Sequence, residues 1–282
     1  VRKAGYKTCI CSNNFVTRIR ELDNKFDFLA DFDVKVFSFA LDDNPALDED
    51  YKKNLKKEYS GLWYQRYIEG KWVLAEGAVY DFFDERIHTI PYPPSPATYY
   101  ILGVDYGTSN PCVFTLIGYN SGSYPNMWLE KEYYYDSKAK NRQKSDSEYA
   151  LDLIEFLRGY QVKAIYVDPS ALSFKVEMRK MGLNNIFDAD NDVLTGIRFT
   201  SQLISNGTFK ICKVCTNAIK EFSTYVWDER ASKRGIDQPL KQNDHVMDSL
   251  RYALYTHFFN KNQSRKTEQD YIDMERLYAK KF

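Results

Sequence analysis

Three aspartates stand where carboxylates can do metal chemistry. Asp105 ends the apolar run over 99–105, Asp168 ends the run over 163–168, and Asp248 lies in a helical stretch near the C-terminus. Three converging carboxylates repel one another, so without a cation at least one would be driven to protonate. Hard oxygen ligands of this kind suit Mg²⁺ or Mn²⁺. Two such ions about 3.5–4 Å apart can bind the attacking and leaving oxygens of a phosphodiester displacement.

The surroundings of Asp248 supply further candidates. On a helix, Asp248 lies about 200° from Val246, outside the apolar stripe, so we expect it to face a cleft. Asp244 lies one turn earlier, and His245, three residues before Asp248, reaches the same side. Any one of these aspartates alone is more often structural, because Asp favours turns and caps. Two aspartates at equivalent strand ends, with a third on a polar helix face beside a histidine, are harder to explain as purely structural residues.

The elements that must position these residues follow from hydrophobic periodicity. Strands are predicted over 99–105, 112–119 and 127–135 as an antiparallel meander, followed by a helix whose capping box is Ser145 to Glu148. A short buried strand over 163–168 comes next, and a helix that ends at about residue 181 follows it. Further helices are predicted over 193–204, 216–227 and 244–259. A short strand near Phe209 lies between the first two of these. This order predicts an α/β fold whose mixed sheet is antiparallel at one side and parallel beyond it. It resembles the strand order of a ribonuclease-H-like fold flanked by helices.

A proline-rich segment marks the clearest boundary. Four of the nine prolines lie within 91–96, which predicts a stiff linker over 91–98 between a smaller segment, 1–90, and a domain over 99–260. The smaller segment is predicted to hold a strand over 33–40 and helices over 48–59 and 62–68. Residues 261–282 are expected to form a polar tail.

Composition bounds the classes of protein. Lys and Arg together number 39, as do Asp and Glu, and this balance argues against a uniformly cationic DNA-coating protein. Hydrophobic residues make up 44% of the chain, which argues against a disordered protein. An acid-lined metal site can offset a basic groove, so zero net charge leaves nucleic acid open as a partner. No apolar run approaches the ~20 residues of a membrane span, and no secretion signal opens the chain. We therefore expect an intracellular protein without a membrane partner.

Residues 103–110, Gly-Val-Asp-Tyr-Gly-Thr-Ser-Asn, also resemble the first phosphate-binding hairpin of the actin and sugar-kinase superfamily. That superfamily needs a second glycine-rich loop and a glycine pair near adenosine. Here none of the 13 glycines is adjacent to another, and the P-loop pattern is absent. An ATP-binding module of this class remains an alternative function.

Several longer stretches resemble the large terminase subunits of tailed bacteriophages. The most specific is 241–253, Lys-Gln-Asn-Asp-His-Val-Met-Asp-Ser-Leu-Arg-Tyr-Ala. Further stretches that resemble the nuclease domain lie at 165–170, 190–197 and 225–228. Residues 41–48 and 67–84 resemble the segment that ends the ATPase domain of this family. The resemblance covers about residues 33–260.

This resemblance implies a nuclease that cuts concatemeric viral double-stranded DNA during packaging in the bacterial host cytoplasm. Asp105, Asp168 and Asp248 would be the ligands of two Mg²⁺ or Mn²⁺ ions, and His245 an accessory residue, as is Asp244. We expect Lys241 to contact a phosphate. The terminase small subunit and the portal protein would be partners.

The Walker motifs are missing, so we expect no ATPase activity from this chain alone, with 1–90 as a partial end of the ATPase domain. Two other functions stay open at this point. One is a non-catalytic packaging module with a vestigial site, and the other is a junction resolvase or transposase on the same fold.

Overall fold

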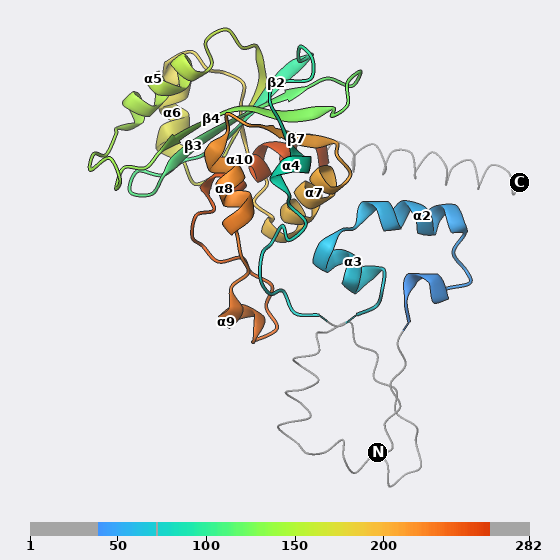
Figure 1. Ribbon diagram of the computed structural model, residues 1–282. Coiled ribbons are helices and arrows are strands. Elements are labelled where there is room, and N and C mark those ends of the chain that lie inside the picture. The colour runs from blue at the N-terminus through green and yellow to red at the C-terminus, as the bar shows by residue number, and fades with distance from the viewer. Residues whose placement is uncertain (1–38, 72, 260–282) are drawn as a thin grey trace, which may run out of the picture.

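The computed structural model describes residues 39–71 and 73–259. Its centre is a seven-stranded sheet in the order β1-β7-β4-β3-β2-β5-β6 (Figure 1). The strands are β1 (Thr89–Ile90), β2 (Tyr99–Asp105), β3 (Cys112–Tyr119), β4 (Met127–Tyr135), β5 (Val162–Val167), β6 (Ile186–Asp188) and β7 (Phe209–Cys212). The antiparallel meander β2-β3-β4 is confirmed with the predicted bounds.

The sheet is parallel on both sides of this meander, whereas the sequence predicted parallel strands on one side. β5 and β6 continue beside β2, and β7 and β1 continue beside β4, all in parallel pairs. A helical crossover returns a strand parallel to its predecessor, and such a crossover brings β7 to the outer side of β4. β1 has two residues, which is too short for a periodic pattern to reveal.

Helices cover both faces of the sheet (Figure 1). The α-helices that the structure describes are α2 (Glu49–Glu58), α3 (Gly61–Tyr67), α4 (Glu85–His88), α5 (Asp146–Phe156), α6 (Leu172–Lys180), α7 (Val193–Ser205), α8 (Thr216–Thr224), α9 (Glu229–Ser232) and α10 (His245–Leu254). Of these, α2, α3 and α9 lie away from the sheet (Figure 1). Side chains alternate between faces along a strand, so Ile101 packs in the core with α7, α8 and α10. Leu102 packs in the second core with α5 and α6.

Local chemistry accounts for several of these helix starts. The predicted capping box of α5 is present: Ser145 Oγ accepts from the Glu148 N–H at 3.3 Å, and Glu148 Oε2 accepts from the Ser145 N–H at 2.9 Å. Asp48 and Asp192 cap α2 and α7 in the same manner, each through its carboxylate. These caps satisfy amide groups that the first helical turn leaves without partners.

α10 is the central helix of the site-bearing face, and it is more enclosed than its sequence predicted. The predicted helix over 244–259 is α10 followed by a π-helical turn, Tyr255–Phe259. Every residue from Val246 to Leu254 is buried, including Asp248, which is 8% exposed. The polar face of α10 therefore lies against protein and not in an open cleft.

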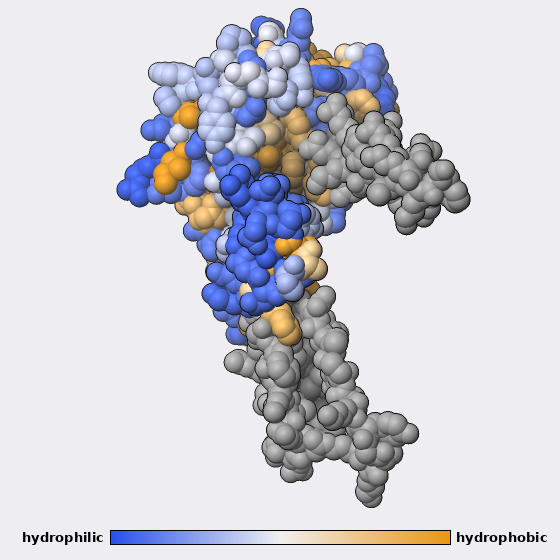
Figure 2. Space-filling model, turned by 90° about the vertical axis from the view of Figure 1, so that its right-hand side faces the viewer, coloured by the Kyte–Doolittle hydropathy of each residue, from blue (hydrophilic) through white to orange (hydrophobic). Residues whose placement is uncertain are grey.

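The N-terminal described segment contains α2 and α3 near the bounds predicted for them. α2 has the sequence Glu-Asp-Tyr-Lys-Lys-Asn-Leu-Lys-Lys-Glu, and Figure 2 shows the largely hydrophilic surface over it. The Arg66 side chain of α3 forms a buried bidentate ion pair with Asp237, and Arg66 Nη2 also donates to the Val73 carbonyl at 2.8 Å. This pair joins the segment to the loop after α9.

The proposed division at 91–98 stays a prediction, and the structure adds that β1 and the side chains of Val79 and Tyr80 pack with the sheet's core. Most of the strand predicted over 33–40, and the tail over 261–282, lie outside the described residues. Among the helices that the structure describes, none is long and apolar enough to cross a lipid bilayer.

Candidate functional site

The predicted aspartates at two strand ends occupy neighbouring positions at one edge of the sheet. β2 and β5 are parallel, and Val104 pairs with Val167, so Asp105 and Asp168 are the next residues along adjacent strands. The carboxyl ends of parallel strands are where sites form in open α/β sheets. This part of the site follows from topology that the sequence already indicated.

A glycine in β2 allows α10 to approach this edge closely. A Cβ atom on Gly103 would lie 1.9 Å from the carbonyl oxygen of Ser249, so only glycine fits beneath the helix backbone. Ser249 Oγ and Thr115 Oγ1 form a buried hydrogen bond at 2.8 Å that holds the helix on the strands. Sequence reasoning missed Gly103, although a glycine inside an apolar strand signals close approach of another backbone.

His245 at the start of α10 connects this helix to β2. Its Nδ1 donates to Asp105 Oδ2 at 2.8 Å. Burial raises the pKa of Asp105 to about 6; the hydrogen bond from His245 opposes this rise, and the charges of Asp248 and Asp244 add to it. Burial lowers the pKa of His245, but the hydrogen bond and charge of Asp105 outweigh burial, so the net shift is upward. Burial thus sets the direction of the Asp105 pKa shift, whereas the neighbouring acids set that of His245.

Asp248 is held between two cations. Its Oδ2 accepts from Lys241 Nζ at 3.1 Å, and its Oδ1 accepts from Arg251 Nη2 at 3.0 Å. Lys241 Nζ also lies 3.3 Å from Asp244 Oδ2. Burial lowers the pKa of Lys241, but the charges of Asp248 and Asp244 outweigh it and raise the pKa. Lys241 is about half exposed, whereas Arg251 is buried, so only Lys241 is open to a ligand.

Tyr252 connects α10 to Asp168, and sequence reasoning missed it. Its hydroxyl donates to Asp168 Oδ2 at 2.8 Å, and the Ser170 N–H donates to Oδ1 at 2.7 Å. Asn191 donates to Oδ2 at 3.3 Å. Burial favours the neutral acid, but these hydrogen bonds outweigh it and hold the pKa of Asp168 below its usual value. Tyr252 lies four residues after Asp248, and that spacing places the two on neighbouring helix positions.

Glu221 on α8 is a further acid of the site that sequence reasoning missed. Its Oε2 accepts from the N–H groups of Val246 at 2.7 Å and Met247 at 3.3 Å, so it caps the start of α10. Its Oε1 is buried without a hydrogen-bond partner among the described residues. Burial raises the pKa of Glu221 to about 7, although these two N–H groups oppose the rise. The sequence carried a signal for Glu221, because this acid lies three residues after Ala218 on the apolar face of an amphipathic helix.

The donor set suits a hard divalent cation, although the side chains as they lie do not form a ready cage. Within 39–71 and 73–259, no group of three or more His, Cys, Asp or Glu is arranged to hold a metal ion. Lys241 and Arg251 instead neutralise Asp248, and His245 pairs with Asp105. Buried carboxylate oxygens with a raised pKa are nevertheless the chemistry that a bound divalent cation would stabilise.

Comparisons with known proteins agree with this architecture. No family profile matches the chain. The large terminase subunit of Escherichia phage T5 is 23% identical over 224 residues, which are 76% of this chain and 50% of that protein. The nuclease domain of the phage P22 large terminase superposes with a TM-score of 0.50 at 18% identity over 64% of this chain and 92% of that domain. At that identity the likeness shows the ribonuclease-H-like fold, which confirms the predicted fold class.

A higher identity is found with the large terminase of a thermophilic bacteriophage, solved in complex with ATP-gamma-S. It is 42% identical with a TM-score of 0.72, over 78% of this chain and 55% of that protein. The chain thus spans about half the length of these relatives. The stretches over 165–170 and 241–253 agree with this relationship, and the chain belongs to the large terminase family of tailed bacteriophages.

Proposed function

We propose that this chain is a metal-dependent endodeoxyribonuclease that cuts concatemeric viral double-stranded DNA during genome packaging. The observation that carries the proposal is the role of α10. This one helix bears Asp248 and hydrogen-bonds both strand-end aspartates, Asp105 through His245 and Asp168 through Tyr252. One helix thereby links three carboxylates that come from three separate elements. Aspartates that only form turns or caps would not need such links.

Asp105, Asp168 and Asp248 would hold two Mg²⁺ or Mn²⁺ ions. Bound there, the ions supply Lewis-acid stabilisation of the phosphodiester and activation of water. The protein's own groups set the geometry. His245 orients Asp105, Tyr252 orients Asp168, and the buried Arg251 fixes Asp248 through Oδ1. Lys241 Nζ, half exposed beside Asp248, is positioned to bind a phosphate oxygen of the substrate.

The test is cleavage of plasmid DNA by the purified chain with Mg²⁺ or Mn²⁺, which a chelator should stop. Asp168→Asn should abolish cleavage. Asp188→Asn is the matched control, because Asp188 also ends a parallel strand, the adjacent β6, but is exposed and pairs with Lys175. Full activity in Asp168→Asn would contradict the proposal.

A non-catalytic packaging module is the second candidate, and one observation favours it. Both oxygens of Asp248 already have cationic partners within the protein. For this candidate, metal should neither support cleavage nor alter stability, and the chain should still bind duplex DNA. Metal-dependent cleavage that Asp168→Asn removes would exclude it.

The biological setting follows from the family to which the chain belongs. We propose that the chain acts in the infected host cytoplasm with the terminase small subunit and the portal protein. Pull-down of each purified partner by the chain tests these two contacts. ATP hydrolysis is not expected from this chain alone, and a phosphate-release assay checks that expectation.

A further inference from the structure

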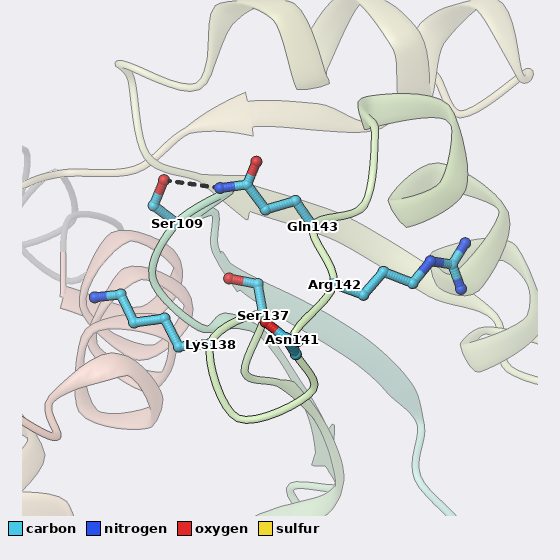
Figure 3. Close-up of a pocket in the computed structure, with 6 residues that line it drawn as sticks. All are labelled: Ser109, Ser137, Lys138, Asn141, Arg142 and Gln143. Atoms are coloured by element: carbon cyan, nitrogen blue, oxygen red, sulfur yellow. Dashed lines mark hydrogen bonds between the residues drawn. The ribbon is translucent and has the colours of Figure 1, made fainter.

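A polar pocket lies beside the loops that follow β2 and β4 (Figure 3). Two loops form it: the loop between β2 and β3, and the loop over 136–145 that follows β4. Because β2 and β4 are both antiparallel to β3, they run in the same direction and end at the same edge. The cavity measures about 440 Å³, and it is lined by Ser109, Ser137, Lys138, Asn141, Arg142 and Gln143.

The lining has the chemistry of an anion site. Its six side chains are hydroxyls, amides and two cations, with no carboxylate among them. Lys138 Nζ lies 3.3 Å from the neutral Asn110 Oδ1, and it makes no ion pair within the described parts of the chain. Among the described residues, Arg142 forms an ion pair only with Glu148, at the surface, and an exposed pair of this kind is readily exchanged for another anion. Positive charge is therefore available to a ligand.

Ser137 lines the pocket with a largely buried side chain. Its side chain lies among the other lining side chains in Figure 3, and the residue is 4% exposed. Its hydroxyl has no hydrogen-bond partner among the described residues. Figure 3 shows the Lys138 and Arg142 side chains extending to opposite sides of Ser137. A buried hydroxyl without a partner costs stability, so its retention between these two residues points to a ligand that supplies an acceptor.

Hydrogen bonds within and between the two loops fix the shape of the pocket. Gln143 Nε2 donates to Ser109 Oγ at 3.3 Å across its two loops. Arg142 N–H donates to the Ser137 carbonyl at 3.0 Å, and Asn141 N–H donates to the Lys138 carbonyl at 3.1 Å. Asn141 adopts a φ of 49°, a left-handed conformation that Asn tolerates in tight turns. A preformed loop loses less entropy on binding than a disordered one.

We propose that this pocket binds a backbone phosphate of duplex DNA beside the phosphodiester that is cut. The proposal rests on the proposed function and names a contact that holds its substrate. Phosphate contacts of this kind set the register of DNA on a protein and carry no sequence preference. Lys138 and Arg142 supply charge, and the Ser137 hydroxyl donates to a phosphate oxygen.

The main test compares two double variants of the full chain. Lys138→Ala/Arg142→Ala removes the pocket's cations. Arg158→Ala/Lys180→Ala is the matched control, because both residues are exposed, have surface carboxylate partners, and follow α5 or end α6 at the opposite edge. Binding of a short fluorescent duplex is measured by anisotropy in chelator across a salt series. Each lost phosphate contact should lower the slope of log affinity against log salt by about 0.9.

We expect the pocket variant to bind duplex DNA about tenfold more weakly, with a slope reduced by about one, while the control keeps the wild-type slope. Equal slopes in the two double variants would overturn the proposal. If the wild type binds and cleaves DNA but the slopes are equal, only the pocket proposal fails. If the wild type neither binds nor cleaves duplex, the proposed function fails.

Ser137→Ala separates ligand binding from folding. It removes a buried hydroxyl that has no partner, so the melting temperature should stay the same or rise, while duplex affinity falls severalfold. A lower melting temperature with unchanged affinity would show a purely structural role for Ser137 and would overturn its part in the proposal.

Discussion

Two regions of this molecule bury charged side chains: in the Arg66–Asp237 pair the charges balance, whereas near Asp105 they do not. Arg66 and Asp237 have side chains that are 8% and 10% exposed and form a bidentate pair, and Arg66 Nε and Nη2 also donate to the Val73 carbonyl. At the aspartate edge, acids outnumber their partners. Of the eight buried polar side-chain atoms without hydrogen bonds in the described residues, four belong to Glu221, Asp244 and Arg251.

The difference separates structural charge from functional charge. A balanced, bidentate ion pair stabilises one arrangement of two segments. A cluster with surplus acids and perturbed pKa values costs stability that a purely structural site would not retain. The aspartate edge is therefore expected to gain stability from mutations that remove charge, whereas the Arg66 pair is expected to lose it.

Breaking the balanced pair should have the largest effect. Arg66→Ala leaves the Asp237 carboxylate buried without its partner, which should cost about 3–5 kcal/mol of unfolding free energy. Urea denaturation measures the loss. Arg86→Ala is the control, since Arg86 pairs with Asp84 at the surface and its loss should leave the free energy of unfolding nearly unchanged. Similar losses in both variants would remove the contrast between the two regions.

Neutralising an acid at the aspartate edge should reduce activity without a matching loss of stability. Asp105→Asn should lower DNA cleavage about a hundredfold or more, because it removes a proposed ligand. Its unfolding free energy near pH 8 should be equal to or above that of wild type, because the substitution removes a negative charge that Asp248 and Asp244 repel. Cleavage rates and urea denaturation of the same preparation check both halves. A stability loss as large as that of Arg66→Ala would contradict the comparison.

The pH dependence of stability should carry the signature of the surplus acids. Burial raises the pKa of Glu221 from 4.5 to about 7, so between these values the folded state binds more protons than the unfolded chain. Stability should therefore fall as pH rises through this window, by about 3 kcal/mol from Glu221. The raised pKa of Asp105 acts in the same direction between its usual value and about 6.

Glu221→Gln isolates this contribution, because its amide oxygen can still accept from Val246 and Met247. Its denaturation free energy should vary less between pH 5 and pH 8 than that of wild type. Glu177→Gln, at an exposed pair on α6, is the control and should leave the wild-type pH dependence in place. Parallel pH curves for wild type and Glu221→Gln would rule out this role of Glu221.

Removing one orienting hydroxyl should have the smallest effect. Tyr252→Phe keeps the packed aromatic ring at this position of α10 but removes the hydroxyl that donates to Asp168 Oδ2. Cleavage should fall by up to about tenfold, as is common when a residue that orients a ligand is lost. Tyr124→Phe removes a hydroxyl that donates to the Asn206 carbonyl away from the aspartates, and it should leave cleavage unchanged. Equal rates in the two variants would count against an orienting role for Tyr252.

Much of the fold and part of the site were predictable because they depend on local pattern. Apolar periodicity and turn residues delimit β2, β3 and β4, and the capping box marks the start of α5. Asp105 and Asp168 stand out because a strand end is readable from the chain itself. The two-residue β1 and the three-residue β6 are too short to produce such a pattern.

The sequence by itself determined the element types, the strand-end aspartates and, through 241–253, the family. Only the tertiary structure decided that Asp105 pairs with His245, that Glu221 caps α10, and that the polar face of α10 is buried. The physical reason is separation along the chain. Periodicity reports which face of an element is apolar, whereas the partners of a polar face depend on how distant elements pack, and here Gly103 sets how closely α10 lies on β2.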